Sequence, residues 1–161
     1  MAYLHENLLA VAEGLLDIQG RGTAARRRAI STAYYATFRR IASLCAASLA
    51  LPPPIERDAY EAVLRSLNHK EVRNVLNSPA AREILGDVTG KLFGDLLSAR
   101  EWADYSSVTH VSADKAKAGE KLTRTDALKY VNDAREIISA IDALDDRSRH
   151  KLAIFLAFHK R

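Results

Sequence analysis

An arginine lies within the apolar stripe of a predicted helix in the second half of the chain. At helical spacing the stripe comprises Phe93, Leu96, Leu97, Arg100 and Asp104. Removing an unpaired guanidinium from water is costly, so Arg100 must form an ion pair, donate hydrogen bonds or line a hydrated cleft. Two interpretations follow. Arg100 binds a phosphate in such a cleft, or it forms a structural ion pair with Asp104 one turn later, joined by a tyrosine hydroxyl.

Basic and aromatic side chains are interleaved in a second segment, residues 26–40. On a helix Arg28, Tyr35 and Arg39 share one strip, whereas Tyr34 faces the neighbouring apolar seam. Single-stranded RNA is often bound in this way, with bases stacked on aromatic rings and phosphates paired with basic side chains. The alternative is that both tyrosines pack within a helical bundle and direct their hydroxyls to its polar groups.

The positive charge is concentrated in the same region of the chain. The net charge is +4, from 24 Lys and Arg against 20 Asp and Glu. Between Ile18 and Ile55 there is no acidic residue but there are six arginines, namely Arg21, Arg26, Arg27, Arg28, Arg39 and Arg40. A local basic surface favours partners that carry phosphate. The alternative is a solvated helix face whose charges pair within the fold.

Two motifs in these segments resemble those of the HEPN superfamily. Residues 33–38, Ala-Tyr-Tyr-Ala-Thr-Phe, follow a basic Arg-Arg-Ala-Ile-Ser run at 27–31 and are similar to the second-helix signature of that family. Residues 100–105, Arg-Glu-Trp-Ala-Asp-Tyr, are similar to the later-helix signature of its small prokaryotic branch. The resemblance spans roughly residues 4–144, with helix pattern alone outside the two motifs.

The resemblance implies an all-α bundle, commonly a homodimer, with a cleft formed by the two motif helices. Many members are metal-independent ribonucleases or toxins, often paired with a small nucleotidyltransferase-fold partner that acts as antitoxin. Their arginine holds the scissile phosphate. A histidine that follows after four to six residues moves protons while the RNA 2′-hydroxyl attacks.

The histidine of that motif is missing here, because Tyr105 stands five residues after Arg100 and His110 follows only after ten. A tyrosine hydroxyl, with an ordinary pKa of about 10, is a poor general base at neutral pH. We therefore expect a non-catalytic module that binds RNA or a nucleotide, a nucleotidyltransferase-fold partner, or both, in a toxin–antitoxin-like system. The expected binding residues are Arg28, Tyr35, Arg39, Arg100, Asp104 and Tyr105. The alternatives are a metal-independent endoribonuclease toxin, with Arg100 and Tyr105 as candidate catalytic residues, and a purely structural dimerisation protein.

Helical segments position these motifs, and glycines, prolines and cap residues delimit them. The predicted helices cover residues 4–18, 24–51, 56–67, 71–76 and 79–107, a segment after Thr123 or Thr125, and 148–159. We expect breaks at Gly20 and Gly22, at Pro52–Pro54 and within Gly86–Gly90, and caps at Thr23, at Ser78 before Pro79, and at Asp145 or Asp146. Residues 109–122 are expected to form an exposed loop. No segment alternates as a strand does, so the fold class is all-α, an up-and-down bundle of about five to seven helices.

The 161 residues suit one domain, residues 1–161, and 48% of them are hydrophobic, which is enough for a core. The lone Cys45 excludes a disulfide framework and is expected to be an inert core thiol, while His69 and His150 are expected at the surface. We expect no metal and no cofactor. No stretch is apolar enough to span a membrane and the start lacks a signal-peptide pattern, so a cytoplasmic location is expected. The basic-flanked apolar segment 147–161 is expected to pack on the bundle or across a dimer.

Overall fold

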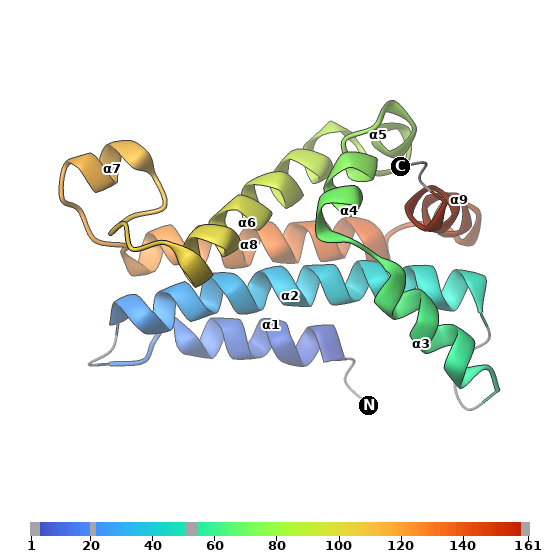
Figure 1. Cartoon of the computed structure of the whole chain (residues 1–161), viewed down its shortest axis with the longest axis horizontal. Coiled ribbons are helices and arrows are strands. Elements are labelled where there is room, and N and C mark those ends of the chain that lie inside the picture. Colours follow the sequence, from blue (N-terminus) through green and yellow to red (C-terminus); the bar gives the residue numbers. More distant parts are fainter. Residues whose placement is uncertain (1–3, 20–21, 51–54, 159–161) are drawn as a thin grey trace. The chain divides into compact units, whose positions relative to one another are not determined.

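Helices make up all the regular structure of the chain in the ranges that the computed structural model describes, residues 4–19, 22–50 and 55–158. Figure 1 traces the elements in chain order: α1 (Leu4–Leu15), α2 (Gly22–Leu49), α3 (Arg57–Ser66), α4 (His69–Leu76), α5 (Pro79–Leu85), α6 (Asp87–Tyr105), α7 (Ala113–Lys117), α8 (Arg124–Asp142) and α9 (Asp146–Ala157). These ranges contain no strand, so the all-α prediction is confirmed. Their nine helices exceed the expected number because several are short.

The chain divides into two compact units. The first unit comprises residues 1–37 and 94–136, and the second comprises residues 38–93 and 137–161. Three helices, α2, α6 and α8, contribute residues to both units. None of the helices in the described ranges has the length and apolar composition needed to cross a bilayer.

The first unit has a core of apolar side chains from α1, α2, α6, α8 and the segment before α8. Its buried members include Ala12, Ile30, Ala33, Tyr34, Leu96, Leu97, Leu122, Ala127, Val131 and Ala134. Two ion pairs add to this packing, from α8 to α1 and to the turn that follows α1. The Nε of Arg124 lies 2.7 Å from Oδ1 of Asp17, and Arg135 pairs with Glu13. Exposed pairs of this kind contribute little to stability, so burial supplies most of what holds α1 in place.

The second unit has its own core, in which α4, α5 and α9 pack against one another. Its buried side chains include Ile41, Leu44, Cys45, Val72, Val75, Leu76, Phe93, Ile137, Ile141, Leu152 and Leu156. Burial raises the pKa of the Cys45 thiol to about 12, so this residue is a core thiol as expected. The side chains of Ile154 and Phe155 on α9, and of Phe158 just after it, remain exposed.

Most of the predicted helix caps are confirmed. The Ser78 side chain accepts a hydrogen bond from the Ala81 amide and Pro79 begins α5, while Asp145 accepts one from the Ser148 amide at the start of α9. Thr123 caps α8, because its Oγ1 accepts from the Asp126 amide at 3.1 Å. The prediction of Thr23 as a cap is wrong, since α2 already begins at Gly22. The predicted breaks at Gly20 and Pro52–Pro54 and the predicted helix end at 159 lie outside the described residues.

The glycine-rich segment between α5 and α6 breaks the helix where the sequence predicts a break. Gly86 has φ 81°, a left-handed conformation that favours glycine, and α6 begins at the next residue, Asp87. Gly90 has a different role. A Cβ atom there would lie 2.4 Å from the Leu76 carbonyl oxygen, so α6 approaches the end of α4 closely at this point.

The segment between α6 and α8 is more ordered than the exposed loop we expected, and this is a correction. It contains the short helix α7, and its His110 and Leu122 are buried in the first unit. Asp126 organises it from the first turn of α8, accepting hydrogen bonds from Lys115 Nζ at 2.6 Å and from the Thr123 amide at 2.9 Å. Polar side chains of this segment, which led to the loop prediction, therefore take part in a hydrogen-bond network within the fold.

Candidate nucleic-acid interface

Arg100 lies at the centre of a polar cluster in the first unit, contributed by α2 and the C-terminal part of α6. Its Nη2 donates a hydrogen bond to the Tyr35 hydroxyl at 2.5 Å and lies 3.5 Å from the Tyr105 hydroxyl. Its Nε lies 2.9 Å from Oδ2 of Asp104, an ion pair without hydrogen-bond geometry. The structure thus brings together four of the six predicted binding residues.

Tyrosine rings surround the same guanidinium. The Cζ of Arg100 lies 5.3 Å from the ring centroids of both Tyr35 and Tyr105, and 6.0 Å from that of Tyr34. Tyr34 is fully buried and packs edge-on against Tyr35 with centroids 5.6 Å apart. Tyr34 therefore fixes the ring of Tyr35, as expected for a residue of the apolar seam. Tyr105 is 76% exposed, so most of its surface is open to a ligand.

The Arg100 side chain keeps its charge and retains free donor capacity. Burial acts to lower the pKa of this guanidinium. The hydrogen bond to Tyr35 and the charge of the Asp104 carboxylate raise the pKa by more than burial lowers it, so the net shift is upward. Only 13% of the side chain is exposed. Its Nη1 makes no hydrogen bond to any residue in the described ranges. A permanent cation with one unused guanidinium nitrogen is suited to an incoming phosphate oxygen.

The other two predicted binding residues do not join this cluster. Arg28 is exposed on α2 and forms no ion pair or hydrogen bond with the described part of the chain. Arg39 is half-buried and belongs to the second unit. Arg28 therefore remains a predicted contributor of charge in the first unit, and nothing in the geometry of the cluster involves Arg39.

Three arginines of the basic segment have partners within the fold, which is one of the two interpretations that the sequence left open. Arg27 donates to the carbonyl oxygens of Trp102, Ala103 and Ser106 at 3.0, 2.9 and 2.5 Å, and stacks over the Trp102 ring at 4.7 Å. Arg26 donates to the Leu122 carbonyl at 3.0 Å, and in the second unit Arg40 pairs with Asp142 at 2.6 Å. Arg27 caps the C-terminal end of α6, the helix that carries Arg100. The dense run of arginines is thus partly structural.

No exposed histidine lies in the first unit among the described residues, where His5 and His110 are 7% and 3% exposed. The Nδ1 of His110 accepts a hydrogen bond from the Ser112 amide at 2.9 Å, and its Nε2 lies 3.2 Å from Oδ2 of Asp126. In the second unit His150 is exposed, whereas His69 is half-buried and packs on Phe38 with centroids 4.2 Å apart. The described side chains include no group of three or more His, Cys, Asp or Glu arranged to hold a metal.

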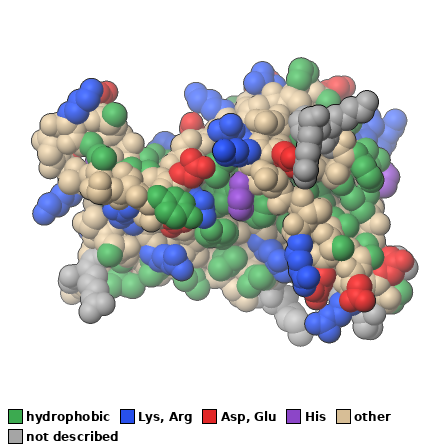
Figure 2. Space-filling view, in the orientation of Figure 1, with side chains coloured by type: hydrophobic (Ala, Val, Ile, Leu, Met, Phe, Trp, Pro, Cys, Tyr) green, Lys and Arg blue, Asp and Glu red, His purple; other side chains and the backbone are tan. Residues whose placement is uncertain are grey.

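Basic side chains do not form one continuous surface in the view of Figure 2. Lys and Arg occur singly or in small groups there, interspersed with acidic and hydrophobic side chains. On this face the feature suited to binding is therefore the local geometry at Arg100.

Comparisons of the chain with protein-family models, with curated proteins and with solved structures gave no match. The resemblance to the HEPN superfamily therefore rests on the two sequence motifs, and the cluster around Arg100 is what those motifs build in this protein.

Proposed function

We propose that the first unit is a non-catalytic binding module for RNA or a nucleotide, in which Arg100 contacts a phosphate. The observation that carries this proposal is the cluster itself: a fixed guanidinium with an unused Nη1, next to the largely exposed ring of Tyr105. Phosphate recognition by a guanidinium and base stacking on an aromatic ring are the two elements of single-stranded RNA binding.

Each residue of the cluster has a defined role in this proposal. The Nη1 of Arg100 donates to a phosphate oxygen, and the ring of Tyr105 stacks on a neighbouring base. Tyr35 and Asp104 hold the guanidinium in position through the contacts at 2.5 and 2.9 Å. This preorganisation reduces the side-chain entropy that Arg100 loses when the phosphate binds.

The test is the affinity for a fluorescent single-stranded RNA, measured in EDTA with Arg100→Ala and with Arg135→Ala as a charge-matched control. Arg135 is an exposed arginine of the same unit whose partner is Glu13. We expect Arg100→Ala to weaken binding about tenfold, which corresponds to loss of about 1.4 kcal/mol. The control should stay within about twofold, since its loss removes long-range attraction only. Equal affinities for the two variants would refute the assignment of Arg100.

A purely structural role for Arg100 is favoured by its low exposure and its two close partners, Tyr35 and Asp104. In that case Arg100→Ala lowers the melting temperature and leaves RNA and nucleotide binding unchanged. Thermal unfolding of the same samples separates the two roles.

The endoribonuclease alternative is tested by the integrity of the RNA in the same assay. Cleavage in EDTA that disappears in both Arg100→Ala and Tyr105→Phe would make this chain an enzyme with those two residues in its active site. The proposed binding module instead leaves the RNA intact, because Tyr105 stands where the family's proton-transferring histidine would be.

We further propose that the chain forms a homodimer in the cytoplasm, and α1 offers a surface for it. One side of α1 carries Leu4, Leu8, Val11 and Leu15, of which Leu4 and Val11 are each 53% exposed. The side is free of charge, so identical copies do not repel each other there. Its 4-3-4 spacing is the same in both directions, so an antiparallel second copy presents matching positions. Gly14 beside this stripe has open space around its Cα, which permits close approach.

The size of this surface predicts a weak dimer. A helix of 12 residues is about 18 Å long, so a pair of them buries less than the roughly 1,200 Å² of a standard interface. We expect twice the 17.8 kDa chain mass in sedimentation, with a dissociation constant on the order of micromolar. Val11→Glu should give the monomer, whereas Ala10→Glu, exposed on another side of α1, should not. A monomeric parent protein at about 100 μM, or a dimer that survives Val11→Glu, would contradict this surface.

A nucleotidyltransferase-fold antitoxin is the remaining proposed partner, and it follows from the family resemblance. The test is co-purification of such a protein with the parent chain, with Arg100→Ala and with Val11→Glu. Loss of the partner in Arg100→Ala would place it on the Arg100 cluster, and loss in Val11→Glu would place it on α1.

A further inference from the structure

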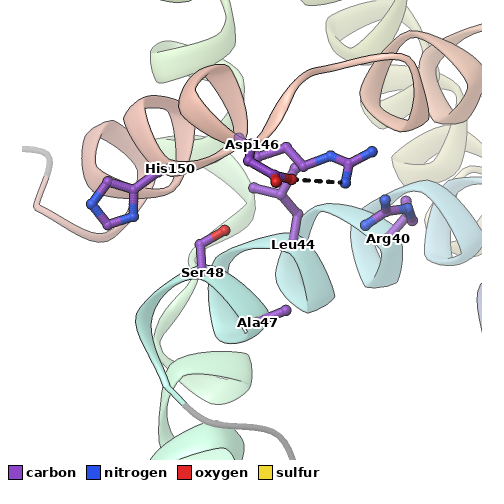
Figure 3. A pocket seen from close by; sticks show the side chains of 7 residues that line it. Arg40, Leu44, Ala47, Ser48, Asp146 and His150 are labelled. Atoms are coloured by element: carbon purple, nitrogen blue, oxygen red, sulfur yellow. Dashed lines mark ion pairs between the residues drawn. The ribbon is translucent and has the colours of Figure 1, made fainter.

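A hollow in the second unit has no part in the function proposed above. Its volume is about 310 Å³, and residues of the C-terminal part of α2 and the N-terminal part of α9 line it. Figure 3 shows Arg40 on one side of it, with Ser48 and His150 on the other, and Arg149 also lines it. Leu44 and Ala47 complete its wall on α2, so the hollow combines polar and apolar surfaces.

The two arginines leave several donors unused. Arg40 donates from Nε to Asp142 Oδ1 at 2.6 Å, and its two terminal nitrogens make no hydrogen bond within the described ranges. Arg149 donates from Nη2 to the Asp142 carbonyl at 2.8 Å, but its Nε is buried and has no hydrogen-bond partner. Protein encloses the Arg149 Nε, so the donors open to a ligand are the two terminal nitrogens of Arg40 and the Nη1 of Arg149.

Acceptors are scarce on the same surface. Asp146 is the one carboxylate of the lining; its Oδ1 lies 3.6 Å from Arg149 Nη1 and its side chain is fully exposed to water. Ser48 and His150 make no hydrogen bond or ion pair with the described part of the chain. The lining therefore offers guanidinium, hydroxyl and imidazole donors in excess over acceptors, which is the composition of an oxyanion site.

We propose that this hollow binds a phosphoryl group, with Arg40 and Arg149 as its principal ligands. Guanidinium groups match the geometry of phosphate oxygens, and two of them face this space. The volume is at the lower end of ordinary ligand sites and exceeds that of one phosphate ion. The ligand is accordingly a small phosphate monoester whose organic part contacts Leu44 and Ala47. The site lies wholly within the second unit and is independent of Arg100.

The experiment is isothermal titration of the purified chain with inorganic phosphate and with glycerol 3-phosphate, in chloride buffer with glycerol as a blank. Arg149→Gln is compared with Arg147→Gln, which removes an equal charge from an exposed position on α9 outside the hollow. Ala47→Phe keeps both arginines and fills the space. Thermal unfolding establishes that each variant is folded.

We expect binding with a dissociation constant on the order of millimolar or below, weakened at least tenfold by Arg149→Gln and by Ala47→Phe. Arg147→Gln should bind as the parent does. Tighter binding of glycerol 3-phosphate identifies a monoester as the ligand class, and equal binding identifies inorganic phosphate. No binding at about 10 mM, or equal losses in Arg149→Gln and Arg147→Gln, would overturn the proposal.

Discussion

Replacement of Gly90 by alanine tests the close packing of α6 on α4 in the second unit. A Cβ at this position would lie 2.4 Å from the Leu76 carbonyl oxygen and 2.8 Å from its carbon. Both are backbone atoms, so no flexible side chain can move aside. Asn77 Nδ2 also donates to the Gly90 carbonyl at 3.1 Å, and any separation of the helices lengthens this bond.

The magnitude follows from two opposing terms. Alanine in place of glycine within a helix gains about 1 kcal/mol of helix propensity. Inserting a methyl group into a packed contact costs about 1–3 kcal/mol, and the absence of a yielding neighbour favours the upper end. We therefore expect Gly90→Ala to be destabilised by about 1–2 kcal/mol. Gly14 of α1 is the matched control: its Cβ would meet nothing within 4 Å, so Gly14→Ala should gain up to about 1 kcal/mol.

The assay is urea unfolding monitored by circular dichroism, with both variants measured beside the parent chain. The expected order of midpoints is Gly14→Ala above the parent and Gly90→Ala below it. A Gly90→Ala protein as stable as Gly14→Ala would refute the close approach of α6 to Leu76.

Three further predictions concern buried polar and thiol groups. Arg27→Lys should lower the free energy of unfolding by about 2 kcal/mol in urea melts, since lysine cannot reach three carbonyl oxygens with a planar fork; unchanged stability would contradict the capping of α6. Burial acts to raise the pKa of Asp126, but bonds from Lys115 and Thr123 hold it well below the ordinary value. The ionised Asp126 therefore stabilises the fold above about pH 4, and this contribution is lost as the pH falls below that. The difference in free energy of unfolding between the parent and Asp126→Asn should become smaller from pH 7 to pH 3. A difference that stays constant would contradict this. The Cys45 thiol, with its pKa raised to about 12, should react with a thiol reagent only on unfolding, and rapid modification of the folded chain would disprove its burial.

The sequence predicted those parts of the site that depend on spacing within one helix. Arg100 and Asp104 are one turn apart, so their ion pair follows from helical geometry. Helix ends at Ser78, Thr123 and Asp145 were predicted because caps are local hydrogen bonds.

The sequence could not show which side chains pair with segments that are distant along the chain. The partners of Arg27 are carbonyl oxygens 75 to 79 residues away, and no residue type marks a carbonyl acceptor. The sequence therefore left two interpretations of the three arginines open, a free basic surface or pairing within the fold, and in the structure Arg26 and Arg27 donate to backbone carbonyls. Residues 109–122 were misjudged for a similar reason, because their polar side chains have partners on α8.

The salt dependence of RNA affinity tests most directly whether Arg100 contacts a phosphate. Each phosphate of a single strand that a basic side chain neutralises contributes about 0.7 to the slope of log affinity against log salt concentration. We predict that Arg100→Ala has a slope shallower than that of the parent by about 0.7, with Arg135→Ala unchanged. Parallel lines for the parent and Arg100→Ala would show that this arginine does not bind phosphate, and would leave it a structural element of the α2–α6 contact.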